Sequence, residues 1–85
     1  MKTEQIIALI MAEIDRAEQL HPAWPHDLVK ASAIVAEEAG ETLQAANDYD
    51  ESRSGKRQIA TEAVHTAATA IRLLKNINLE GNGNE

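Results

Sequence analysis

The 85-residue sequence contains no cysteine and no phenylalanine, and Trp24 and Tyr49 are its only aromatic residues. Without cysteine the chain has no disulfide, no thiolate nucleophile and no cysteine-based zinc or iron–sulfur site. Hydrophobic residues make up 44% of the chain, but many of them are alanine, which buries little surface. Because a domain of this size buries only ~60% of the surface of its unfolded chain, we expect one small domain that associates with further copies.

Basic residues are scarce as well, since 8 Lys and Arg stand against 14 Asp and Glu, for a net charge of −6. An acidic surface without a basic patch repels a phosphate backbone, so we expect no nucleic-acid polymer as partner. The longest apolar run, Ile6 to Ala12, is shorter than the ~20 residues of a membrane span and follows Glu4 rather than a basic leader. We therefore expect a soluble, cytoplasmic protein with no membrane partner.

Apolar side chains recur every three or four residues in three segments, which predicts helices over residues 3–20, 25–49 and 58–77. Thr3 is the expected N-cap of the first helix, and Pro22 and Pro25 separate it from the second. Gly40 interrupts the second helix, which indicates either close packing or a site that needs room. A polar segment, residues 48–56, separates the second and third helices.

This pattern predicts an all-α fold of three helices per subunit. The first helix is apolar over roughly 200° of its surface, which is wider than one neighbouring helix requires. We expect the antiparallel second and third helices to pair with those of another subunit in a four-helix bundle, with the first helix packed across it. The assembly would be a homodimer or homotetramer. Residues 79–85 have no apolar anchor and are expected to form a disordered tail.

The acidic residues Glu37, Glu38 and Glu41 lie in the second helix, and Glu62 and His65 lie in the third. At about 100° per residue, Glu38 falls inside the apolar stripe, Glu41 at its edge and Glu37 outside it. A charged carboxylate among apolar side chains is costly unless it is paired or binds a cation. Carboxylates one helical turn apart, opposed by ligands from an antiparallel helix, suit Mg²⁺ and its phosphate ligands. The alternative is that these glutamates are ordinary solvated surface residues.

The two-part motif Glu37-Glu38-x-x-Glu41, twenty intervening residues, and Glu62-x-x-His65 resembles the signature of the MazG-like all-α nucleoside triphosphate pyrophosphohydrolases. The resemblance covers about residues 21–77 and makes residues 1–78 a single MazG-like helical domain. It implies hydrolysis of a nucleoside triphosphate to the monophosphate and pyrophosphate. It also implies Mg²⁺ held by Glu38, Glu41, Glu62 and the residue at His65, with Glu37 orienting water or a ligand.

His65 stands where the family has an aspartate. An imidazole weakens the site for Mg²⁺ and favours Mn²⁺ or another transition metal. It also creates a second hypothesis, because Glu-x-x-His is the motif of ferritin-like di-iron bundles, with Glu38 or Glu41 as the bridging carboxylate in a homodimer. A third hypothesis is a non-catalytic helical interaction module whose site has decayed, with His65 as a surface residue.

No glycine-rich phosphate loop is present, so side chains and the metal would have to hold the nucleotide. Trp24 could stack on a base or seal the end of the bundle. The cations that could neutralise the triphosphate are Lys30, Lys56, Arg57 and Arg72, each of which could equally be a solvated charge.

Overall fold

The computed structural model describes residues 1–80, and these form three α-helices and no strand. The helices are α1 (Thr3–Leu20), α2 (Leu28–Asp50) and α3 (Lys56–Asn76). The predicted all-α class and number of helices are therefore confirmed. Of the predicted disordered tail, residues 81–85 lie outside the described part of the chain. No helix among residues 1–80 is both long enough and apolar enough to span a membrane.

The first residues of α1 and α2 differ from the predicted ones because local capping interactions determine where each helix begins. α2 begins after Asp27, whose carboxylate accepts hydrogen bonds from the backbone N–H groups of Val29 (2.9 Å) and Lys30 (3.2 Å). Helix therefore starts three residues later than the prolines suggest. The N-cap of α1 is Lys2 rather than Thr3, and the Gln5 side chain accepts a 2.8 Å hydrogen bond from the Lys2 backbone N–H.

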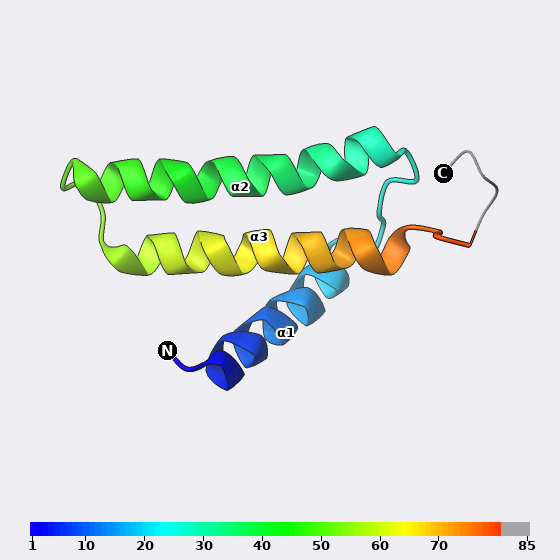
Figure 1. Ribbon diagram of the computed structural model, residues 1–85, viewed down its shortest axis with the longest axis horizontal. Helices are drawn as coiled ribbons and strands as arrows, with labels where there is room; N and C mark the ends of the chain where they lie inside the picture. The colour runs from blue at the N-terminus through cyan, green and yellow to red at the C-terminus, as the bar shows by residue number, and fades with distance from the viewer. Residues whose placement is uncertain (81–85) are drawn as a thin grey trace.

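The helices α2 and α3 lie antiparallel and side by side, and α1 crosses α3 obliquely (Figure 1). Within the described chain α1 packs against α3 and not against α2. The turn between α2 and α3 places Ser52 at φ 62°, and Arg53 forms ion pairs there with Asp48 (3.3 Å) and Glu51. The chain thus forms a long helical hairpin with one helix laid on its α3 side.

The core is small and consists mainly of alanine. Its buried apolar side chains are Ile14, Ala31, Ala45 and Ala68. Alanines at the facing positions of α2 and α3 let the two helices approach closely. Gly40 does not serve this purpose, because a Cβ atom built at Gly40 meets nothing within 4 Å. The expectation of close packing at Gly40 is therefore wrong for contacts within this chain.

Candidate metal centre

The register of α2 against α3 is fixed by a pair of threonine hydroxyls. The Oγ1 atoms of Thr42 and Thr66 lie 3.0 Å apart. Each hydroxyl also lies within hydrogen-bonding distance of the carbonyl four residues earlier, that of Glu38 (3.3 Å) or Glu62 (2.9 Å). Because Glu38 and Glu62 each precede one of these threonines by one turn, the pair holds the two glutamates opposite one another.

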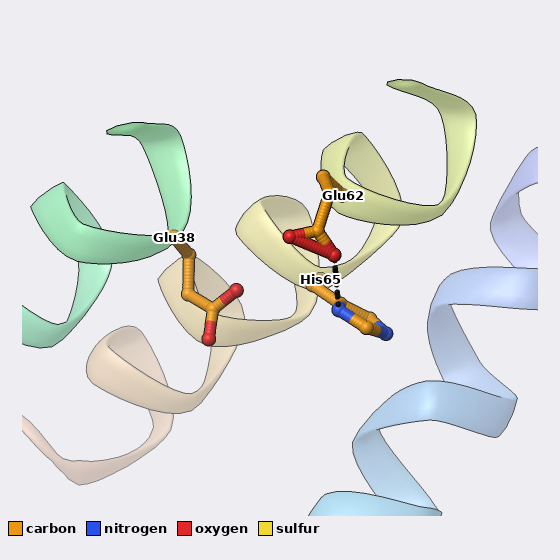
Figure 2. A group of neighbouring side chains, drawn as sticks. All are labelled: Glu38, Glu62 and His65. Carbon is orange, nitrogen blue, oxygen red and sulfur yellow. Dashed lines mark ion pairs between the residues drawn. The ribbon is translucent and has the colours of Figure 1, made fainter. Parts of the chain in front are cut away.

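Glu38, Glu62 and His65 form the centre of the site. One ligand atom from each lies within 4.8 Å of the others, and the Glu38 carboxylate points from α2 toward the two side chains of α3 (Figure 2). His65 Nδ1 is 3.2 Å from Glu62 Oε1. The Glu62 side chain is 13% exposed and that of His65 is 30% exposed, so both are largely shielded from water. His65 is therefore not the surface residue of the third hypothesis.

The surroundings of Glu38 are unfavourable for a negative charge. Its Oε2 atom is buried and has no hydrogen-bond partner. Burial raises the pKa of the Glu38 carboxyl, and the negative charge of Glu41 and a hydrogen bond with it raise the pKa further. A buried carboxylate oxygen without a donor is costly. A bound cation would remove that cost.

The other two glutamates of the motif, Glu41 and Glu37, lie outside this group of three residues. Glu41 is exposed and close enough to Glu38 to affect its pKa, and with Glu62 it lines a shallow pocket of about 170 Å³. It does not belong to the group formed by Glu38, Glu62 and His65. Glu37 is exposed and outside that group as well. Glu38 is thus the most buried of the three, as the helical spacing predicts, whereas Glu41 and Glu37 are both exposed.

Sequence reasoning missed Glu13 of α1. Its Oε2 atom lies 3.6 Å from His65 Nε2, and its side chain is 15% exposed. Hydrogen bonds from Arg16 to both carboxylate oxygens, of 2.8 and 2.6 Å, lower the pKa of Glu13. The signal was present in the sequence, because Glu13 lies between Ile10 and Ala17 on the apolar side of its helix, as Glu38 does in α2.

The centre opens on a pocket of about 420 Å³ lined by all three helices and by the segment between α1 and α2. Trp24 and Arg72 line this pocket together with Glu38 and His65. The Arg72 guanidinium lies 5.0 Å from the centre of the Trp24 ring and donates a 2.6 Å hydrogen bond to the His21 carbonyl. Arg72 therefore fixes the segment that carries Trp24, and its buried Nε atom has no partner.

The predicted phosphate-binding lysines lie elsewhere. Lys56 begins α3, and its Nζ atom lies 5.7 Å from the centre of the Tyr49 ring. Lys30 is in the first turn of α2 and is exposed. Neither lysine lines the pocket with Trp24, whereas Arg16 does. Of the residues named as possible substrate-binding groups, only Trp24 and Arg72 line this pocket within one chain.

No protein-family model, curated protein or solved structure matches this chain at a significant level.

Proposed function

We propose that the chain is a metal-dependent nucleoside triphosphate pyrophosphohydrolase, which converts a (deoxy)nucleoside triphosphate and water to the monophosphate and pyrophosphate. The observation that carries the proposal is the convergence of Glu38, Glu62 and His65 from the two halves of the motif, next to a pocket. The buried, unpartnered Oε2 atom of Glu38 supports a cation at this point. The MazG-like resemblance of the motif supports the reaction.

A divalent metal bound here would neutralise phosphate charge and activate water for attack on the α-phosphorus. The chain's own residues would hold that metal through Glu38, Glu62 and His65, with Glu41 at the open edge. Trp24 offers an aromatic face in the pocket that could stack on a base. The resemblance assigns water orientation to Glu37, which is exposed and next in sequence to Glu38.

The donor set supports Mn²⁺ over Mg²⁺. Mg²⁺ strongly prefers oxygen ligands in a regular octahedron, whereas Mn²⁺ accepts imidazole more readily. Two carboxylates and one imidazole form the group of nearby ligand atoms. We therefore expect activity with Mn²⁺ to exceed activity with Mg²⁺ at equal concentration.

The proposal includes a homodimer or homotetramer in which two hairpins form a four-helix bundle. Large apolar side chains are exposed on every helix: Ile7 (54%), Leu9 (46%) and Met11 (54%) on α1, Leu43 (63%) on α2 and Leu74 (66%) on α3. An apolar groove of about 460 Å³ also lies between α1 and α3, lined by Leu9, Ala12 and Val64 among others. Apolar surface on this scale typically marks a protein interface.

The experiment is incubation of the protein with a panel of NTPs and dNTPs, each with Mg²⁺ or Mn²⁺, and identification of the products. The proposal requires monophosphate and pyrophosphate in equal amounts and loss of both with Glu62→Gln. Release of inorganic phosphate and the nucleoside diphosphate would contradict cleavage between the α and β phosphates. Absence of any turnover would favour the interaction module.

A second candidate, a di-iron protein, is favoured by one observation. Glu62 and His65 form the Glu-x-x-His pair with its side chains 3.2 Å apart, and Glu38 completes half of a di-iron ligand set. A second copy of the chain would supply the other half. Rapid oxidation by dissolved O₂ of two added Fe²⁺ ions per dimer, without hydrolysis of any triphosphate, would favour this function over the first.

A further inference from the structure

The two ring nitrogens of His65 face carboxylates from two different helices. Nδ1 lies 3.2 Å from Glu62 on the same helix, and Nε2 lies 3.6 Å from Glu13 on α1. Figure 2 shows the ring extending from α3 toward α1, with its far nitrogen turned away from Glu38 and Glu62. One nitrogen thus faces the metal-ligand group and the other faces α1.

Glu13 is a fixed and anionic acceptor. Arg16 donates from Nε and Nη2 to its two oxygens, at 2.8 and 2.6 Å, in the bidentate geometry that restrains a carboxylate most strongly. The same hydrogen bonds keep the pKa of Glu13 below its usual value, so it accepts and does not donate at neutral pH. The 3.6 Å separation of Glu13 Oε2 from His65 Nε2 is within ion-pair distance and longer than a hydrogen bond.

A neutral imidazole has one N–H group and one lone pair, on opposite nitrogens. Without a metal each ring nitrogen of His65 faces a carboxylate, and Glu62 at Nδ1 is closer (3.2 Å) than Glu13 at Nε2 (3.6 Å). A cation between Nδ1 and Glu62 would need the lone pair on Nδ1, and Glu13 is then the anion that faces the N–H group on Nε2. A metal-binding histidine typically donates its other N–H to a carboxylate in this way.

We propose that Glu13 is a positioning residue, which holds His65 with its proton on Nε2 so that Nδ1 joins Glu38 and Glu62 as a nitrogen ligand for a divalent transition metal. This inference rests on the metal site of the proposed function and deepens it. It adds a role for α1 and predicts which ring nitrogen binds. It also assigns the site to metals that accept nitrogen, such as Mn²⁺, Fe²⁺, Co²⁺ and Zn²⁺.

The chain offers a matched control for the docking of α1. Glu18 of α1 forms a 2.7 Å ion pair with Lys75 of α3, outside the ligand group. Glu13→Gln and Glu18→Gln each remove one negative charge from α1 and one contact with α3. They differ in that Glu13 alone faces His65.

The test is nitrogen-15 NMR of the imidazole rings, using two-bond correlations that report which nitrogen carries the proton. The chain has three histidines, and His65→Asn identifies the signals of His65. When the diamagnetic ion Zn²⁺ is added to the wild-type protein, we expect a selective shift of Nδ1 and the proton on Nε2. Glu13→Gln should change the Nε2 signal of the Zn²⁺-bound ring and weaken Zn²⁺ binding by about 10- to 100-fold. Glu18→Gln should do neither.

Zn²⁺ bound through Nε2 of the wild-type protein would overturn the inference, and this measurement needs no variant. No metal binding, or equal effects of Glu13→Gln and Glu18→Gln, would also overturn it. The proposed function can fail separately. Zn²⁺ at Nδ1 in a protein that cleaves no triphosphate would contradict the enzyme and leave the role of Glu13 intact. Pyrophosphate release with a His65 ring that no metal perturbs would do the opposite.

Discussion

Two regions of the molecule reverse the usual distribution of side chains. The inner side of the α2–α3 hairpin holds charged groups, and the outward side of α1 exposes apolar groups. Inside, the Glu38 Oε2 atom is buried without a partner, close to Glu62 and His65. Outside, Ile7 and Met11 of α1 are each 54% exposed. Both arrangements cost free energy in an isolated chain, because the first buries charge and the second leaves apolar surface in water. A cation inside and a second copy of the chain outside would remove these costs separately.

We expect the largest loss of activity from a substitution among the charged residues on the inner side of the hairpin. Glu38→Gln removes a metal ligand, so metal-dependent pyrophosphate release should fall by more than the ~100-fold typical of residues that only support a ligand. Steady-state kinetics with saturating Mn²⁺ measure this. The matched variant Glu37→Gln alters the exposed neighbour and should be milder. An equal loss from Glu37→Gln would show that the exposed glutamate contributes as much as the buried one.

Charged substitutions in α1 test whether its exposed apolar side mediates self-association. Ile7 and Met11 lie one turn apart, and the double variant Ile7→Glu/Met11→Glu should weaken self-association by roughly 100-fold or more, since burial of each large apolar side chain is worth ~1.5–3 kcal/mol. Sedimentation equilibrium of wild type and variant measures this. Gln19→Glu adds one negative charge at another exposed position of α1 and should leave association unchanged. A wild-type mass near 9.3 kDa at micromolar concentration would contradict the predicted oligomer.

His65→Asp tests the metal preference of the proposed site, because it replaces a nitrogen ligand with an oxygen ligand. An oxygen ligand suits Mg²⁺ better than imidazole does, so Mg²⁺ affinity should rise by about 10-fold and the preference for Mn²⁺ should fall. Parallel titrations of both metals by calorimetry measure the change. If the variant bound Mg²⁺ more weakly than wild type does, the assumed ligand geometry at residue 65 would be wrong, and unchanged Mg²⁺ binding would mean that His65 is not a ligand. In a di-iron protein the same change should reduce Fe²⁺ binding.

Gly40→Ala tests whether Gly40 contacts a second subunit. A Cβ atom at this exposed helical position meets nothing within the chain. The substitution should therefore raise the free energy of unfolding by about 1 kcal/mol. Urea denaturation measures the effect. A loss of stability, together with weaker self-association, would mean that a second subunit packs on Gly40 and that the glycine is needed there.

The smallest effect concerns pH. Because the pKa of Glu38 is raised above its ordinary value of 4.5, the folded chain retains a proton that the unfolded chain has released in the window between the two values. The free energy of unfolding should therefore decrease as pH rises through that window, and Glu38→Gln should remove this decrease. Glu13 acts in the opposite sense, since its pKa is lowered and its contribution is lost as pH falls below 4.5. Denaturation at several pH values without divalent metal measures both slopes.

The fold was largely predictable from the sequence because each helix has its own apolar period and the polar segments between them are short. Asp27 was missed as the N-cap because the prolines before it gave a stronger start signal. The greater burial of Glu38 than of Glu37 and Glu41 follows directly from helical spacing. The contact between Glu13 and His65 depends on how α1 crosses α3, and sequence periodicity does not determine a crossing angle. The role of Arg72 under Trp24 likewise depends on the path of the segment after α1.

The central claim is that the half-buried acidic cluster is a metal site, and titration with Mn²⁺ followed by the EPR signal of the free ion tests it most directly. The account predicts saturable loss of the free-ion signal with wild-type protein. It predicts no such loss with the double variant Glu38→Gln/Glu62→Gln, which circular dichroism should show to be equally helical. Equal Mn²⁺ binding by the folded double variant and the wild type would contradict the claim.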